Sequence, residues 1–324
     1  MFRIIICSSF LYAGLSTAFA DTNTFATCAQ LALIARSNYL QNQTFCITAK
    51  VVFANRYYLG LQDETGSILA LSGTSSVERG DTIRANVWTK HISNISTTLC
   101  CWNVEVLSHS DPINPIAAEA SDIATGKYDF KLISLKGTVK AAFNDEIDTK
   151  FYGASIQSGT HLFYVSTYTP LANIDSLIGT DVTITGICDP RPHPNRKYVG
   201  RTIYADPHNG ILPHVKTSDP FDAPPISELA DISPDAISYC SRHRTSGNVL
   251  ATWARNRIVV KNADGTITAA KLIHENLPNV GDSIAVSGFP ETDLFHINLS
   301  QAKWKKYPSR ISLKRTSRPF QPTL

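Results

Sequence analysis

The 324-residue sequence predicts an all-β protein built from three tandem small β-barrels, each preceded by a short helix. Three observations predict this fold class: a block of sequence that recurs three times, strand-like alternation after each copy, and Gly-containing turns between the strands. The hydrophobic fraction of 43% is sufficient for several globular cores. Gly and Pro, at 17 residues each, stay at ordinary levels, which excludes a collagen-like or low-complexity chain.

The recurring block is anchored on small residues that are each followed two positions later by valine: Ala49, Gly137 and Gly247. Residues that lie 21 positions before each anchor mark the start of the block without any gap: Cys28, Ile116 and Ile226. In the third copy the apolar residues Ile226, Leu229 and Ile232 have helical spacing, so a short helix is expected before the first strand of each unit.

Each anchor is followed by a Gly-containing turn, at 63–68, 157–160 and 262–267. A second glycine then precedes an alternating strand, as in Gly80 before Ile83, Ala85 and Val87. A glycine within the first strand is typical of the sharp bend that a small barrel needs to close. About five short strands per unit favour the OB type of barrel, while a series of β-sandwiches is the alternative.

The domain boundaries follow from the repeat and from the ends of the chain. We expect a signal peptide at 1–20, because a basic start is followed by an apolar run and by Ala18-Phe19-Ala20. OB-like modules are expected at 21–112, 113–222 and 223–307, with a basic tail at 308–324. No later stretch approaches the ~20 apolar residues of a membrane span, so an exported protein, periplasmic or secreted, is predicted.

Removal of the signal peptide would leave six cysteines: Cys28, Cys46, Cys100, Cys101, Cys188 and Cys240. An even number in an oxidising compartment permits disulfides, although the spacing does not choose a connectivity. Buried thiols are the alternative. No C-x-x-C is present, which disfavours a zinc knuckle or a thioredoxin-type site.

Several motifs resemble the tandem OB-like modules in the extracytoplasmic sensor regions of bacterial hybrid sensor histidine kinases. The stretch Ile226–Leu229 leading to Val249 resembles the start of such a module, and Leu61–Gly66 resembles its second-strand turn. Gly281-Asp282 and Gly288-Phe289-Pro290 resemble its later part. The resemblance covers most of residues 25–307, without the kinase part. It implies an exported, non-enzymatic binding or interaction protein that recognises an extracytoplasmic ligand or an envelope protein.

No constellation in the sequence indicates catalysis or a cofactor. There is no G-x-S-x-G, H-E-x-x-H, Walker loop or G-x-G-x-x-G. The best group of potential metal ligands is His193, Asp206, His208 and His214, but solvated loop residues explain it better, so we predict no metal site. An envelope hydrolase with an unrecognised site remains a further alternative.

Aromatic and basic residues give candidates for ligand binding, because OB-type barrels bind oligomers on the face of their second and third strands. These candidates are Tyr57, Tyr58, Trp253, Arg255 and Arg257. Stacking rings beside arginines suit nucleic acid or an anionic polysaccharide, which is the main alternative to a small ligand or protein partner.

The net charge of +3 hides an uneven distribution. From 302 to the end there is no acid, and seven basic residues occur: Lys303, Lys305, Lys306, Arg310, Lys314, Arg315 and Arg318. The rest of the expected mature chain has 22 basic and 27 acidic residues. This division predicts that any contact with a polyanion lies mainly in the basic end.

Overall fold

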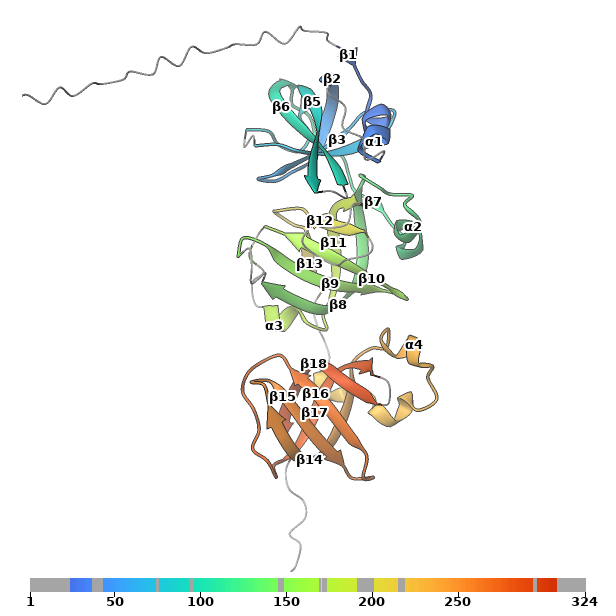
Figure 1. The fold of residues 1–324 in the computed structure, drawn as a ribbon, viewed down its shortest axis with the longest axis vertical. Helices are drawn as coiled ribbons and strands as arrows, with labels where there is room; N and C mark the ends of the chain where they lie inside the picture. Colours follow the sequence, from blue (N-terminus) through green and yellow to red (C-terminus); the bar gives the residue numbers. More distant parts are fainter. Residues whose placement is uncertain are drawn as a thin grey trace, which may run out of the picture.

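The computed structural model describes residues 24–36, 43–73, 76–93, 96–144, 149–168, 170, 174–190, 201–214, 219–293 and 296–307. Three β-barrels follow one another along the longest axis of the molecule (Figure 1). Short helices precede the first long strand of every barrel. The predicted all-β chain of three OB-like barrels, each preceded by a short helix, is therefore confirmed.

The first barrel begins with a short edge strand and a helix, followed by five longer strands. Its elements are β1 (Thr24–Phe25), α1 (Cys28–Arg36), β2 (Phe45–Ala54), β3 (Tyr58–Gln62), β4 (Ser67–Leu71), β5 (Thr82–Ser93) and β6 (Ser96–Ser108). The apolar side of α1, with Cys28 and Leu31, packs into the barrel core. The β3–β4 turn holds the start of this helix, because Asp63 Oδ2 accepts a hydrogen bond from Cys28 N at 2.7 Å.

The second barrel carries an extra edge strand at either side of its sheet. Its elements are β7 (Ile116–Ala117), α2 (Ala120–Thr125), β8 (Leu132–Asn144), β9 (Tyr152–Ser158), β10 (His161–Thr167), α3 (Ile174–Leu177), β11 (Asp181–Asp189), β12 (Thr202–Ala205) and β13 (Ile211–Pro213).

The third barrel is preceded by two 3₁₀ turns and one helical turn in place of a single helix. Its elements are η1 (Pro220–Asp222), η2 (Ile226–Leu229), α4 (Pro234–Ile237), β14 (His243–Trp253), β15 (Arg257–Asn262), β16 (Ile267–Leu272), β17 (Ser283–Thr292) and β18 (Ile297–Lys306). The helical spacing from Ile226 thus produces η2, and Pro234 starts α4.

All three barrels have the same strand order, and each one closes. If the five long strands of a barrel are counted along the chain, the ring runs 1-2-3-5-4 and returns to 1 through a pairing of strands 1 and 4. Strands 3 and 5 pair in parallel in every barrel. This is the five-stranded Greek-key ring of an OB-fold, which excludes the alternative of sandwiches.

The anchors of the repeat mark the bend of the first strand. A β-bulge follows every anchor, between Val51 and Phe53, Val139 and Ala141, and Val249 and Ala251. The valine carbonyl before each bulge accepts a hydrogen bond from the glycine that precedes strand 4, at 2.8, 2.7 and 2.8 Å. The three glycines are Gly80, Gly179 and Gly281, and their φ angles are 101°, 84° and 90°. Residues with a side chain rarely adopt this conformation. The repeated glycines therefore fix one bent-strand geometry three times.

The first two barrels share an apolar junction. Phe53, Gly60 and Leu69 stand opposite one another on β2, β3 and β4 and point away from the first barrel's own core. Phe53 and Leu69 form one buried cluster with residues of the second barrel: Phe130, Leu132, Ile187 and Tyr204. A Cβ at Gly60 would lie 2.5 Å from Ile187 Cδ1, so only glycine allows this close approach.

None of the six cysteines is in a disulfide, which corrects the prediction of disulfide bonds. Cys188 and Cys240 belong to the second and third units, and the other four lie in the first barrel as separate thiols: Cys28, Cys46, Cys100 and Cys101. Burial raises the pKa of the Cys28, Cys101 and Cys188 thiols to about 12. In the part of the chain that is described, no helix is long and apolar enough to cross a membrane.

Candidate functional site

The outer side of β14, β15 and β16 in the third barrel brings together an aromatic ring and two cations. Trp253 stands opposite Arg257, and Arg257 stands opposite Lys271 on the next strand. Residues directly opposite one another on adjacent strands point to the same side of a sheet. The three side chains therefore form one row on the outside of the barrel, across its first three strands.

Two further rows extend the same surface. Together the three rows make up what we call the third-barrel face: Trp253, Arg257 and Lys271; Ala251, Val259 and Ala269; and Asn248, Lys261 and Ile267. The middle row is small or β-branched, so the larger side chains on either side rise above it. The third-barrel face is thus a shallow strip with Trp253 at one end and Ile267 at the other.

The charge of the third-barrel face is uniformly positive. Its nine residues include Arg257, Lys261 and Lys271 and no carboxylate. Trp253 is 43% exposed, which leaves much of its ring available. An exposed tryptophan beside cations can stack on a planar group while the cations attract negative charge. The arrangement is suited to binding a planar group that carries negative charge.

Arg255, which the sequence offered as a binding candidate beside Trp253 and Arg257, does not belong to this face. It lies in the turn between β14 and β15 and has a φ of 61°. Its guanidinium Nη1 is 3.7 Å from Glu275 Oε1, and both side chains are well exposed. The turn therefore separates Arg255 from the row that contains Arg257.

Tyr57 and Tyr58 lie at the junction of the first and second barrels. The Tyr57 ring is 4.6 Å from that of Tyr168, and the Tyr58 ring is 4.9 Å from that of Tyr204, measured between centroids. Both tyrosines thus pack against rings of the second barrel and contribute to the docking of the two barrels.

Three of the seven basic residues predicted to contact polyanions belong to a barrel strand. Lys303, Lys305 and Lys306 are part of β18. The Lys305 ammonium is 3.5 Å from Asp219 Oδ2 and lies over the Phe221 ring, and that of Lys306 is 3.6 Å from Asp282 Oδ2. The other four lie outside the described residues: Arg310, Lys314, Arg315 and Arg318.

The residues considered as metal ligands are not assembled into a metal site in the described part of the chain. Asp206 accepts a hydrogen bond from Arg79 Nη1 at 2.7 Å and also caps the turn at His208. His214 Nε2 is 2.9 Å from Thr183 Oγ1, and His193 lies outside the described residues, as does the predicted signal peptide. Within the described ranges, no three His, Cys, Asp or Glu side chains are grouped as metal ligands would be.

Lys261 and Lys271 belong to the face but were not among the binding candidates predicted from the sequence. Lys261 follows the buried Val260, and Lys271 lies between the buried Ala270 and Leu272. Because side chains alternate between the two sides of a strand, the sequence already indicates that both lysines point outward. Their position beside Trp253 depends on the strand register, which the bulge after Val249 shifts by one residue.

No family model and no curated protein matches the chain. Among solved structures, the chain is similar to one described as an aspartyl-tRNA synthetase of Leishmania major Friedlin, with 8% identity and a TM-score of 0.26, over 37% of this chain and 26% of that one. The chain therefore spans about a quarter of that protein's length.

Two other similar structures are matched over nearly their full length. One is the p204 HINb domain, with 11% identity and a TM-score of 0.27, over 54% of this chain and 98% of that one. The other is a murine DNA binding protein bound with double-stranded DNA, with 16% identity and a TM-score of 0.26, over 55% of this chain and 98% of that one. The assignment of the barrels to the OB type rests on the strand pairings of the chain itself.

Proposed function

We propose that the third-barrel face binds an anionic polymer, with single-stranded nucleic acid as the class of ligand. The observation that supports this most is the row of Trp253, Arg257 and Lys271 across the first three strands of a closed OB barrel. OB barrels bind single strands by stacking bases on aromatic side chains within a positively charged groove. The role is one of binding without chemistry.

Single-stranded nucleic acid suits this face better than a folded protein partner does. A base offers a planar π-face to Trp253 at every repeat of the polymer, and each phosphate can approach one of the cations. None of the nine residues of the face is an acid, so a polyanion lying along these rows meets cations and no carboxylate among them. If residues 1–20 direct export, as the sequence predicts, an anionic polysaccharide becomes the competing polymer.

The proposal is tested by fluorescence anisotropy with a labelled oligothymidylate of about 12 nucleotides, a length within the footprint of OB barrels. We expect Trp253→Ala to weaken binding by about 5- to 150-fold, since stacking of one base contributes about 1–3 kcal/mol. Trp88→Ala is the matched control, because Trp88 is 40% exposed but lies on β5 of the first barrel. Unfolding curves of both variants show whether either change perturbs the fold.

Two outcomes would overturn the proposal. Equal losses of affinity in Trp253→Ala and Trp88→Ala would show that the third-barrel face is not the specific binding surface. Tight binding of a sulfated or uronic-acid polysaccharide, with none of the oligothymidylate, would replace nucleic acid by polysaccharide as the ligand class.

A further inference from the structure

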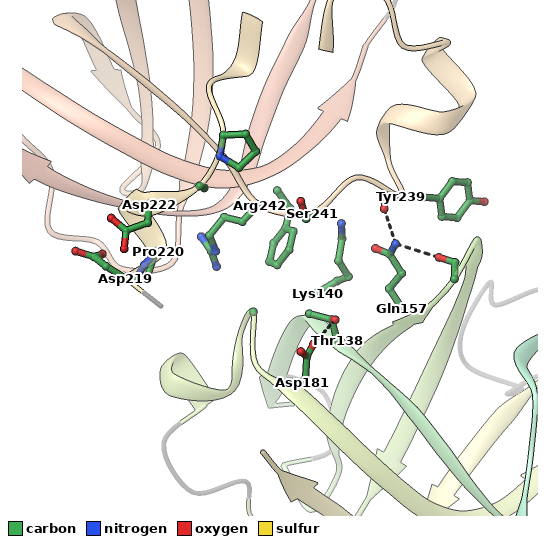
Figure 2. A pocket seen from close by; sticks show the side chains of 15 residues that line it. Thr138, Lys140, Gln157, Asp181, Asp219, Pro220, Asp222, Tyr239, Ser241 and Arg242 are labelled. Atoms are coloured by element: carbon green, nitrogen blue, oxygen red, sulfur yellow. Dashed lines mark hydrogen bonds between the residues drawn. The ribbon is translucent and has the colours of Figure 1, made fainter. Parts of the chain in front are cut away.

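A cavity of about 550 Å³, open to solvent on one side, lies at the junction between the second and third barrels (Figure 2). The second barrel contributes Lys140 and Gln157 among others, and the third unit contributes Tyr239 and Arg242. Clefts between domains are common positions for small-molecule sites, and this volume lies within the range that such sites occupy. The cavity is distinct from the third-barrel face, since none of the nine residues of that face lines it.

Two cations flank one aromatic ring in the wall of the cavity. The Lys140 Nζ lies 4.2 Å from the centroid of the Phe289 ring, and the Arg242 Cζ lies 4.6 Å from it. Lys140 reaches across the junction and donates a hydrogen bond to the carbonyl oxygen of Cys240 at 2.8 Å. Figure 2 shows Lys140 and Arg242 entering the same space from opposite barrels. The wall thus concentrates positive charge at the contact between two modules.

Arg242 is buried without a counter-charge. It is only 8% exposed, and its Nη1 donates to the carbonyl oxygens of Ser287 and Gln301 at 3.0 and 3.1 Å. Its Nε and Nη2 have no hydrogen-bond partner among the described residues. Neither Arg242 nor Lys140 forms an ion pair with any described carboxylate. Burying a cation in this way costs free energy unless an anion compensates for it.

The pKa values of the two groups agree with this geometry. Burial lowers the pKa of Lys140 from its ordinary value near 10.5 to about 8, and it lowers that of Arg242 to about 10. An anion bound between them would restore the interaction that both cations lose on leaving water.

Three carboxylates at the edge of the cavity restrict the charge of a ligand. Asp181 accepts a hydrogen bond from Thr138 Oγ1 at 2.5 Å, and Asp219 accepts one from Phe221 N at 2.9 Å. Asp222 follows on the same turn and lines the same cavity. A ligand with several negative charges would be repelled here, whereas an ammonium group would be attracted. The balance favours a ligand that carries one carboxylate and one positive charge.

We propose that the cavity between the second and third barrels is a binding site for a small zwitterion of peptide or amino-acid type. Its carboxylate lies against Lys140 and Arg242, its ammonium faces the carboxylates of Asp181 and Asp222, and its apolar body packs on Phe289 and Tyr239. Because the ligand touches both barrels, its binding also strengthens their docking.

The proposal is tested by isothermal titration calorimetry of the full chain with trialanine. We expect binding, and about a tenfold or greater loss of affinity when the peptide's carboxylate is replaced by an amide, which removes a charge-assisted hydrogen bond. Lys140→Met should cause a loss of the same order. Lys136→Met, a change of an exposed lysine on the same strand but outside the cavity, should leave affinity unchanged.

Trialanine amide and N-acetyl-trialanine keep the proposal testable even if Lys140→Met disturbs the junction, because they are measured on the unaltered protein. Absence of trialanine binding, or equal binding of the peptide and its amide, would overturn the proposal. N-acetyl-trialanine should bind several-fold more weakly, and tighter binding of it would refute the role of the acidic edge. Oligothymidylate binding should be the same in Lys140→Met, so the two proposals fail independently.

Discussion

The first and third barrels present the same strand surface to different surroundings. In the first barrel, the row directly after the bulge is Phe53, Gly60 and Leu69, and it is buried against the second barrel. In the third barrel, the equivalent row is Ala251, Val259 and Ala269, flanked by Trp253 and three cations. One scaffold therefore serves as a docking surface when the row is apolar and as a candidate binding surface when it is small and bordered by charge.

The junction between the first and second barrels differs from that between the second and third in whether its buried cations have a counter-charge. At the first, the guanidinium of Arg79 is paired at 2.7 Å with Asp206, whose side chain is only 2% exposed. At the second, Lys140 and Arg242 are without such a carboxylate. The cation of the first junction thus has a buried counter-charge within the protein, whereas the two cations of the second junction leave room for an anionic group of a ligand.

The largest expected effect is on the docked row. Phe53→Ala should lower the free energy of unfolding by about 3–5 kcal/mol, because it leaves a cavity in a fully buried cluster. Ile267→Ala, on the exposed third-barrel face, should change it by no more than about 0.5 kcal/mol. Denaturant unfolding of both variants measures the difference. Equal losses of stability would contradict the claim that the row of Phe53 is docked while the third-barrel face is exposed.

A smaller effect is expected where the docked row needs glycine. Gly60→Val introduces at this position the residue that Val259 supplies in the third barrel. We expect a loss of about 1–3 kcal/mol, because the new Cβ meets Ile187 and lies 2.9 Å from Phe53 Cβ. Thermal unfolding measures the loss, and a variant as stable as the parent would show that the first two barrels are not tightly docked.

Charge removal should separate the third-barrel face from the basic strand β18. Arg257→Gln with Lys271→Gln should reduce the slope of log affinity for oligothymidylate against log salt by about 1.4, at roughly 0.7 per cation on a single strand. Lys305→Gln with Lys306→Gln removes the same charge, but these lysines already face Asp219 and Asp282 and should change the slope less. A larger change in the second pair would move the site to β18.

The last prediction concerns the second junction and the dependence of its stability on pH. Since the folded pKa of Lys140 is about 8 and its ordinary value is near 10.5, the folded state loses this proton first as pH rises. The free energy of unfolding should therefore rise between pH 8 and 10.5 relative to Lys140→Met, whereas below pH 8 the difference should be constant. The difference between the two proteins cancels the cysteines, which ionise in the unfolded state in the same range. A flat difference would contradict the burial of a charged Lys140.

Much of the fold could be predicted because it depends on local rules. Gly137 and Gly247 predicted the bend of the first strand, and Gly80 and Gly281 predicted the start of the fourth. The candidate binding site was harder to predict from the sequence. Tyr57 and Tyr58 are aromatic residues of the kind that stack on bases, but only the packing between barrels shows that they lie against Tyr168 and Tyr204.

The cations of the second junction were beyond sequence reasoning for a similar reason. Lys140 and Arg242 are 102 positions apart, and each has an ordinary neighbourhood along the chain. They meet over Phe289 only because two separately folded barrels dock. Contacts within a repeat are specified by its pattern, whereas contacts between repeats depend on shapes that the pattern does not contain.

The claim that the strand surface docks in the first barrel and binds polymer in the third is tested most directly by photocross-linking. A bromodeoxyuridine oligonucleotide would be irradiated with the full chain, and the modified peptides would be identified by mass spectrometry. We expect cross-links at Trp253 and its neighbours on β14–β16, and none on β2–β4. Cross-links at Tyr57 or Tyr58 without any at Trp253 would contradict it.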